Sequence, residues 1–246
     1  HKQSIEGILE SHILPAFGKM KISAIKKQDI LTFRAALAKV QTRTKKTLSA
    51  SRINHIMTPL RMMLNEAADR YEFTTPWKNI KALKVPRTEV DPFSLEEVEK
   101  LINTAPDDFK PYYIVRFFTG LRTGEIDGLH WDKVDLDKKQ IYIDQSLVKG
   151  EMTEAKTDGS NRVIKLTDRV VSALKVQMQV TKNKSEFVFC KADGKQFNYQ
   201  TISRVIWEPM LQRLNLKYRN PYQTRHTFAT LLLAAGESPE WRAQQM

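Results

Sequence analysis

The sequence predicts a mainly α protein, in which an N-terminal helical bundle precedes a mixed α+β domain with a small antiparallel sheet. Apolar residues recur at i, i+3 and i+4 through most of the chain, which is the spacing of a helix that buries one face. Strict alternation, the period of a strand, begins only after Trp131. An aperiodic segment at 87–92, which follows one proline and ends in another, separates the two parts. We therefore predict domains at 1–86 and 93–246.

The first predicted domain is a bundle of about four helices. Apolar residues at helical spacing mark 5–14, 26–37 and 49–71, and the first of these segments ends near Pro15 and Gly18. The longest segment carries a stripe of Ile, Met and Leu, which is more often core packing than a groove for a partner. We expect Lys and Arg on the outer faces of the bundle.

The second predicted domain opens with a helix start and continues with strands. In Ser94-Leu-Glu-Glu97 the serine can accept from a first-turn amide while the glutamate reaches back, which is a capping box. Residues 140–148 and 162–166 alternate like two half-buried strands, and Asp158-Gly159 between them signals a tight turn. These strands should form the small sheet.

The remaining elements of this domain are predicted from caps and helix breakers. Helices are expected at 112–121, after Thr167, and at 199–214 with a break at Pro209, while 186–190 reads as a short strand or core segment. A last long helix should start with Asn220 as N-cap and Pro221 as first residue, helped by Gln223, and end at Gly236. Its core side would carry Phe228, Leu231, Leu232 and Ala235, and another helix should open at Ser238-Pro239.

Charge points to a polyanionic partner. The formal net charge is +12 and the isoelectric point is about 9.7. Residues 1–86 hold 16 Lys and Arg against 6 Asp and Glu, a net charge of +10, so the rest of the chain is nearly balanced. A run of charge is often only a solvated face, but this asymmetry favours DNA contact by the first domain.

Several classes of protein are disfavoured by what the sequence contains. Its one cysteine, Cys190, excludes internal disulfides, is typical of a small core residue and fits a reducing compartment. No apolar run approaches the roughly 20 residues that span a membrane. The histidines show no metal-ligand spacing, and no glycine-rich Walker-type loop is present. We expect no metal, no nucleotide cofactor and no membrane partner.

One stretch, Thr119 to Asp135, carries a candidate anion-binding residue. Arg122 lies in a turn flanked by Gly120 and Gly124, with Glu125 three residues later. If a helix starts at residue 123, the carboxylate of Glu125 lies in its first turn, where the helix dipole favours it and where it can orient the arginine. A guanidinium held in this way suits a phosphate or a carboxylate. An ordinary surface Arg–Glu pair explains these residues equally well.

A second stretch, Asn220 to Thr230, settles the choice. Together the two stretches resemble the two arginine boxes of the tyrosine recombinase (phage integrase) family, in which Arg122 matches the first arginine and Arg225 the arginine of the His-x-x-Arg box. Residues 153–166 resemble the family's hairpin that carries a lysine, which is Lys156 here. In isolation Lys156 would read as a solvated loop lysine. The three motifs cover roughly residues 94–246.

The resemblance implies a fold and roles for residues. The first domain would be a core-binding domain on the duplex, and the second a catalytic domain. Arg122 and Arg225 would bind the scissile phosphate, Lys156 would protonate the leaving 5′ oxygen, and Glu125 would support Arg122. Such placed cations match the extra charge of a phosphodiester in transfer. The intermediate would be a 3′-phosphotyrosine.

The chain departs from the family pattern at one position. Tyr222 stands where the His-x-x-Arg box has its histidine. A phenol can donate a hydrogen bond to phosphate, but with an ordinary pKa of about 10 it is a poor base at neutral pH. The adjacent His226 is as compatible with a buried, hydrogen-bonded histidine as with a catalytic one. The general base is therefore left open.

The function that this resemblance implies is that of a site-specific DNA recombinase, or integrase, of a prophage or integrative element. It would act on attachment-type sites in double-stranded DNA, assemble into a synaptic tetramer there, and work in the bacterial cytoplasm. The alternatives are a non-catalytic DNA-binding protein with a recombinase fold and, less favoured, a type IB topoisomerase. Arg122, Lys156 and Arg225 together favour the enzyme, because a pure binder does not need all three.

The family pattern also predicts that the catalytic domain is truncated before its nucleophile. In the family a Gly-His segment and the nucleophilic tyrosine follow the second arginine box, whereas 21 residues follow Arg225 here and none is a tyrosine. We expect the chain as given to be inactive in strand cleavage. Tyr222 is a poor substitute nucleophile, because it lies within a turn of the arginine that should bind the phosphate.

Overall fold

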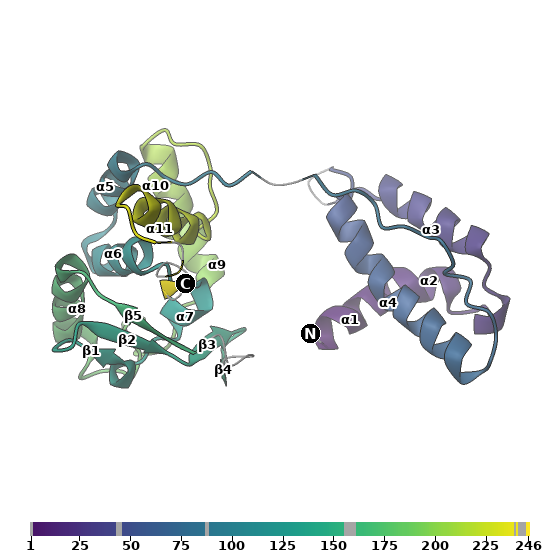
Figure 1. The fold of residues 1–246 in the computed structure, drawn as a ribbon, viewed down its shortest axis with the longest axis horizontal. Helices are drawn as coiled ribbons and strands as arrows, with labels where there is room; N and C mark the ends of the chain where they lie inside the picture. The colour runs from purple at the N-terminus through teal and green to yellow at the C-terminus, as the bar shows by residue number, and fades with distance from the viewer. Residues whose placement is uncertain (1, 43–45, 87–88, 155–160, 239, 241–244) are drawn as a thin grey trace. The chain divides into compact units, whose positions relative to one another are not determined.

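The chain folds into two compact units, His1–Thr88 and Glu89–Met246, called unit 1 and unit 2 below (Figure 1). The computed structural model describes residues 2–42, 46–86, 89–154, 161–238, 240 and 245–246. The division between the units falls inside the segment 87–92 that the sequence gives to the linker.

Unit 1, as far as it is described, is helical. Its α-helices are α1 (Lys2–Ile8), α2 (Leu14–Phe17), α3 (Lys27–Lys39) and α4 (Ala50–Arg70), with a π-helical turn at Leu9–Ile13 and a 3₁₀ turn at Ile22–Ala24. The three predicted helical segments are confirmed. Helix α4 begins where Ser49 Oγ accepts a hydrogen bond from the amide of Arg52, at 3.2 Å.

The core of unit 1 is apolar. Helices α1 to α4 bury Ile, Leu, Met and Phe side chains against one another, and Phe17 meets Phe33 edge to face at 5.1 Å between ring centroids. The chain after α4 returns over this core, where Asn54 exchanges two hydrogen bonds of 2.8 Å with the backbone of Leu83. The predicted use of the α4 stripe as core is confirmed for Ile53, Ile56, Met57, Leu60 and Leu64, whereas Met63, predicted in the same stripe, is exposed.

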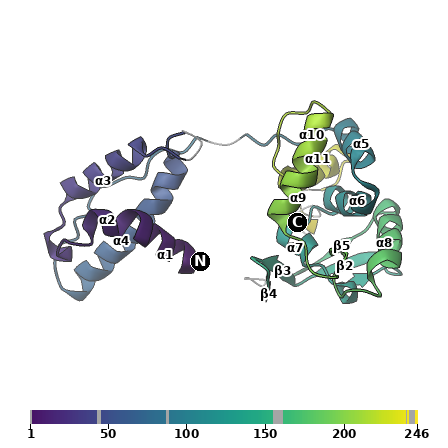
Figure 2. The same cartoon turned by 180° about the vertical axis from the view of Figure 1, so that it is seen from behind.

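Unit 2 combines helices with two small antiparallel sheets. Its α-helices are α5 (Leu95–Thr104), α6 (Lys110–Thr119), α7 (Thr123–Asp127), α8 (Asp168–Thr181), α9 (Tyr199–Ile202), α10 (Glu208–Arg213) and α11 (Gln223–Ala234). Helix α6 lies between α8 and α11 (Figure 1 and Figure 2). The capping box predicted at Ser94 and Glu97 is present and starts α5. The predicted mainly α fold with a small antiparallel sheet is therefore confirmed.

The sheets differ from the prediction in one respect. A three-stranded sheet has the order β1 (Val134–Asp135), β2 (Gln140–Ile143), β5 (Arg162–Lys165), and a separate hairpin pairs β3 (Gln145–Val148) with β4 (Glu151–Glu154). The single strand predicted at 140–148 is thus wrong, because the chain leaves the first sheet at Asp144. That carboxylate is held by Lys133 at 2.5 Å, and beyond it β3 finds a new partner in β4.

The turn of the β3–β4 hairpin is formed by two residues in the left-handed region. Lys149 has φ 53° and Gly150 has φ 85°, which is the backbone of a tight primed turn. The turn predicted at Asp158-Gly159 lies outside the described residues. The sequence reading therefore missed the turn that is described.

The apolar core of unit 2 surrounds α6. Trp207 is fully buried and stacks on Tyr113 at 5.6 Å between ring centroids, while Phe93 meets both Phe117 and Trp207 edge to face. The segment 186–190 contributes buried residues and forms only isolated β-bridges. Of the two predicted alternatives, a short strand or a core segment, the core segment is therefore correct. Along the described part of the chain, no helix is long and apolar enough to cross a membrane.

The segment 199–213 is helical, as predicted, but it is irregular ahead of the proline. A π-helical turn at Ser203–Trp207 joins α9 to α10, and Pro209 lies in the first turn of α10. Pro15 lies in the same position of α2, directly after the π turn of unit 1. A proline has no N–H to donate and its ring crowds the carbonyl four residues back, so a wider turn relieves both problems.

Helix α11 starts later and is less buried than predicted. It begins at Gln223 with Tyr222 as its N-cap residue, so the predicted N-cap at Asn220 is wrong; Asn220 Oδ1 instead accepts from the amide of Tyr222 in the turn before the helix. Of the predicted core residues only Phe228 is buried, whereas Leu231, Leu232 and Ala235 are half-buried or exposed. Gly236 ends the helix with φ 83°, as predicted. The helix expected at Ser238-Pro239 falls largely outside the described residues.

Candidate active site

The first arginine box is shaped by a left-handed glycine at the end of α6. Gly120 has φ 63°, and a Cβ there would lie 2.4 Å from Cδ1 of Phe228 on α11. A side chain is therefore excluded by both backbone strain and the neighbouring ring. The turn delivers Arg122 in an extended conformation, with φ −67° and ψ 155°, as the N-cap residue of α7.

Glu125 holds two arginines at once. Its carboxylate accepts from the Arg122 amide and from Arg122 Nη1, both at 2.8 Å. The same carboxylate accepts from Arg162 Nη1 at 3.0 Å and from Arg162 Nη2 at 2.7 Å. Burial would raise the pKa of the Glu125 carboxyl, but Arg162 and then Arg122 hold it below its ordinary value. Glu125 is thus an ionised, buried bridge, and the contact predicted between Glu125 and Arg122 is present.

Arg162 is the site residue that the sequence reading missed. It starts β5, and its side chain is only 8% exposed. In an alternating strand residues 162 and 164 share a face, and Ile164 is fully buried. An arginine on the inward face of a strand signals a buried anionic partner, because an isolated charge is costly there. That signal was available in the sequence.

Arg225 comes from the second arginine box and lies deep in unit 2. It is on α11, is 6% exposed, and donates from Nη1 to the carbonyl of Gly120 at 2.5 Å and from Nη2 to the carbonyl of Met246. Burial, together with the nearby charge of Arg122, lowers the pKa of Arg225 to about 10, so it remains protonated at neutral pH. The two boxes therefore meet at Gly120.

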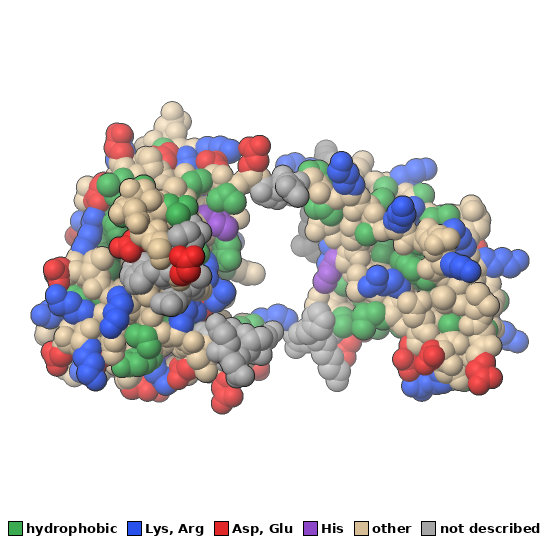
Figure 3. Space-filling view, viewed as in Figure 1, with side chains coloured by type: hydrophobic (Ala, Val, Ile, Leu, Met, Phe, Trp, Pro, Cys, Tyr) green, Lys and Arg blue, Asp and Glu red, His purple; other side chains and the backbone are tan. Residues whose placement is uncertain are grey.

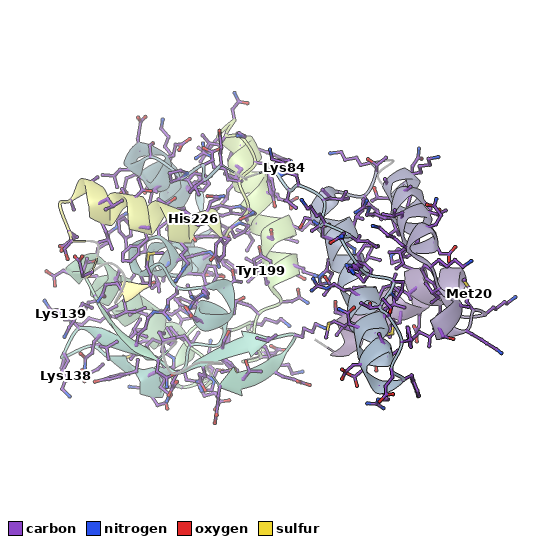
Figure 4. The ribbon with its side chains drawn as sticks, turned by 45° about the vertical axis from the view of Figure 1, so that its right-hand side comes forward. Met20, Lys84, Lys138, Lys139, Tyr199 and His226 are labelled. Carbon is purple, nitrogen blue, oxygen red and sulfur yellow. The ribbon has the colours of Figure 1, made fainter. Side chains whose placement is uncertain are left out.

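Tyr222 and His226 lie together beside Arg225. The Tyr222 side chain is exposed, and its ring meets His226 edge to face at 5.1 Å between centroids. His226, labelled on α11 in Figure 4, is half-buried rather than buried. A phenol at this position can therefore reach a ligand from solvent.

Lys156 lies outside the described residues, but the elements before and after it are fixed on the site. Strand β5 begins with Arg162, which binds Glu125. Strand β3, the partner of β4, packs on α7 so closely that a Cβ on Gly124 would lie 2.4 Å from Ser146 Oγ and 2.7 Å from the carbonyl oxygen of Leu147. The role of Lys156 stays a prediction.

The site suits an anion. One carboxylate, that of Glu125, holds the guanidinium groups of Arg122 and Arg162, and the charge of Arg122 is near enough to Arg225 to lower its pKa. The three arginines together leave an excess of positive charge. Among the described residues no group of three or more His, Cys, Asp or Glu could hold a metal ion. Arrangements of fixed cations like this one can bind a phosphodiester and balance the charge of its transfer.

The fold and the arginine cluster define a protein of the tyrosine recombinase class. Residues 92–244 match the family model of the phage integrase family, and residues 3–38 match the model of the phage integrase N-terminal SAM-like domain. The chain belongs to the phage integrase family. The resemblance drawn from the arginine boxes is confirmed.

Two curated relatives come from Escherichia coli K12. The chain is 31% identical to the protein IntQ over 274 residues, an alignment that covers 100% of the chain and 68% of IntQ. It is 30% identical to the prophage integrase IntR, with 92% of the chain and 62% of IntR covered. The chain thus spans about two thirds of the length of these relatives.

Solved structures share the fold. The integrase of transposon Tn1549 in complex with a circular intermediate DNA superposes with a TM-score of 0.81 at 20% identity, covering 100% of this chain and 83% of that one. A lambda integrase tetramer bound to a Holliday junction gives a TM-score of 0.77 at 14% identity, covering 99% and 70%. At these identities the likeness concerns the fold alone.

Proposed function

We propose that this chain is the DNA-binding and phosphate-binding part of a site-specific DNA recombinase, or integrase, of a prophage or integrative element. The observation that carries the proposal is the pair of arginine boxes. Glu125 orients Arg122 and Arg162 through hydrogen bonds of 2.7–3.0 Å, and Arg225 is tied to the same turn through Gly120. The names of the relatives and the DNA complexes of the structural neighbours support it.

In the proposed reaction Arg122 and Arg225 bind the non-bridging oxygens of the scissile phosphate. A tyrosine oxygen attacks the phosphorus, the bond from phosphorus to the 5′ oxygen breaks, and Lys156 gives that oxygen a proton. The 3′-phosphotyrosine is then attacked by a 5′-hydroxyl of the partner strand, and the phenol leaves. Tyr222 donates a hydrogen bond to the phosphate at the position where the family has histidine.

Unit 1 supplies most of the electrostatic attraction to the DNA duplex. Residues 1–86 carry a net charge of +10, and Lys and Arg side chains are spread over the face of unit 1 seen in Figure 3. Contacts to phosphates release counterions, so the affinity should fall steeply with salt. A fragment that starts near Val90 should bind more weakly and with a flatter salt dependence; an unchanged slope would contradict this role.

The proposed partners are attachment-type sites in double-stranded DNA and further copies of the same protein in a synaptic tetramer. One structural neighbour is a lambda integrase tetramer on a Holliday junction, which supports this assembly. We place the protein in the bacterial cytoplasm with its DNA.

The test starts with the binding site. Footprinting on genomic DNA should give a discrete protected site, and single methylphosphonate substitutions should then find one phosphate per strand whose neutralisation weakens binding. Arg225→Gln should remove that sensitivity, while Arg213→Gln on the exposed face of α10 should not. A protected site without such a phosphate would favour a non-catalytic DNA-binding protein.

The roles in cleavage need separate measurements. In an enzyme that cleaves DNA, Lys156→Ala should slow cleavage less on a duplex with sulfur at the 5′-bridging position than on an ordinary duplex, because a thiolate leaves without a proton. An equal loss of rate on both duplexes would show that Lys156 is not the general acid. Nicked suicide duplexes test the expectation that residues 1–246 hold no nucleophile. A covalent adduct that maps to any of the seven tyrosines would contradict it.

A further inference from the structure

Arg116 is a buried charge that the proposed reaction does not use. It lies on α6, six residues before Arg122, and is 1% exposed. In the part of the chain that the structure describes, Arg116 forms no direct ion pair. A buried guanidinium without a carboxylate beside it is costly, so apolar packing alone would not favour arginine here.

The guanidinium of Arg116 binds both arginine boxes. On one side Nη2 donates to Oγ1 of Thr123, the residue after Arg122, at 2.6 Å. On the other side Nη2 and Nε donate to the carbonyl of Pro221 at 3.1 and 3.4 Å, and Nε donates to Oγ1 of Thr224 at 3.2 Å. Thr224 is the residue directly before Arg225, so the two threonine contacts are each one residue from an arginine of the boxes, and the Pro221 contact is four residues from Arg225.

The positive charge is balanced through a tyrosine. Arg116 Nη1 donates to the hydroxyl of Tyr112 at 2.9 Å, and this hydroxyl donates to Oδ1 of Asp127 at 2.8 Å. Asp127 ends α7, the helix that Arg122 caps, and is 3% exposed. The network therefore touches α7 at its first and last residues, and it reaches the start of α11 through Pro221 and Thr224.

A guanidinium is suited to this task because it is planar and its five N–H groups point in fixed directions. The guanidinium of Arg116 can therefore hold the carbonyl of Pro221 and the hydroxyls of three residues at fixed positions relative to one another. A lysine offers all its donors from a single nitrogen and cannot fix these positions in the same way. Helices α6 and α11 also meet at Gly120 and Phe228, so the same pair of helices is held at a second point.

We propose that Arg116 is a positioning residue, whose guanidinium joins the backbone next to Arg122 to the backbone next to Arg225 and so sets the spacing of the two phosphate-binding side chains. This inference rests on the proposed function for its purpose, and on the hydrogen bonds above for its geometry.

The first experiment tests the geometry without DNA. In the chain of residues 1–246, Arg116→Lys should speed amide hydrogen exchange of peptides covering 121–128 and 220–226 by about tenfold or more, because the link between them is lost. Exchange in the α8 peptide 168–181 should not change. The matched control is Arg169→Lys, which breaks a two-fold hydrogen bond to Glu99 elsewhere in unit 2 and should leave both boxes unchanged.

A second set of variants guards against misfolding. Thr123→Val and Thr224→Val each keep the volume of the side chain and remove one acceptor from Arg116, and each should speed exchange in both boxes by a smaller factor. If Arg116→Lys and both valine variants leave exchange at 121–128 and 220–226 as in the parent chain, the proposed role is wrong.

The third measurement asks whether positioning matters for phosphate binding. At the phosphate that depends on Arg225, a methylphosphonate that weakens parent binding by about tenfold should weaken Arg116→Lys binding by only about twofold. The salt dependence contributed by unit 1 should not change. Retained sensitivity together with faster exchange would overturn the positioning role. If the parent chain has no such phosphate, the proposed function fails, and the exchange result alone decides whether Arg116 couples the boxes.

Discussion

Unit 1 and unit 2 use charge in opposite ways. Unit 1 has a large positive excess, and among its described residues all the buried side chains are apolar. Unit 2 is nearly balanced in net charge, yet it buries Arg116, Glu125, Asp127 and Arg225. Surface charge acts over a Debye length and tolerates rearrangement, whereas buried charge acts at hydrogen-bond distance and fixes direction. The comparison indicates that the charges of unit 1 suit long-range attraction of a polyanion, whereas the buried charges of unit 2 suit the fixed orientation of individual side chains.

The largest expected effect comes from removing the carboxylate that joins two arginines. Glu125→Gln should destabilise unit 2 by about 3–5 kcal/mol, because the buried guanidinium of Arg162 then loses its ion pair with an ionised carboxylate. Unit 1 should not be affected. Chemical denaturation followed by hydrogen exchange in peptides of each unit measures this difference. A loss below about 1 kcal/mol would show that this buried ion pair contributes no more than an exposed one and would weaken the contrast between the units.

The next effect concerns pH. Burial raises the pKa of the Asp127 carboxyl to about 6, so between pH about 4 and 6 the folded state binds more protons than the unfolded state. The contribution of the Asp127 carboxyl to the stability of unit 2 therefore falls as the pH rises from about 4 to 6. Asp127→Asn keeps an acceptor for the Tyr112 hydroxyl and should be more stable than the parent by about 1–3 kcal/mol at pH 7.

At pH 4 the advantage of Asp127→Asn should largely disappear. Denaturation curves of the parent and the variant at both pH values give the difference directly. A constant difference across this range would mean that Asp127 does not titrate as its burial implies.

A matched pair of glycines compares backbone packing in the two units. Gly124→Ala should cost about 1–3 kcal/mol, because the new methyl group meets Ser146 and the Leu147 backbone between α7 and β3. Gly7→Ala in α1 meets nothing within 4 Å and should stabilise unit 1 by about 0.5–1 kcal/mol. Opposite signs in thermal unfolding are expected; equal signs would contradict the tighter packing of the site.

The smallest effect should come from a surface carboxylate of unit 1. Glu66 pairs with Arg70 at 2.8 Å, and both side chains are 66% exposed. Glu66→Gln should change stability by less than about 0.5 kcal/mol. The measurement is the same denaturation curve as for Glu125→Gln, and a large loss here would remove the distinction between exposed and buried carboxylates.

The features that the sequence predicted depend on neighbours a few residues away. The Ser94 and Glu97 box, the start of α4 at Ser49 and the apolar stripe of α4 are all local signals. The arginine boxes also have local signatures, so Arg122, Glu125 and Arg225 could be chosen from the sequence. Of the contacts that these residues make, only that between Arg122 and Glu125 could be predicted from the sequence.

The features that the sequence reading missed depend on distant partners. Arg162 meets Glu125 across 37 residues, and Arg116 meets Thr224 across 108 residues. On α6 an arginine between aromatic residues looks like a solvated side chain until α11 covers it. The prediction of a single strand at 140–148 was wrong for a similar reason, because Lys133 binds Asp144 and β4 provides a separate pairing partner for β3.

The separation of 105 residues between Gly120 and Arg225 has a consequence for synthesis on the ribosome. At about 5–20 residues per second, synthesis from the end of unit 1 to the second arginine box takes roughly 7 to 27 seconds. Unit 1 ends at residue 88, so it can fold during that interval. The nascent chain therefore carries its basic N-terminal residues before Arg225 can reach the carbonyl of Gly120 and bring the two arginine boxes together.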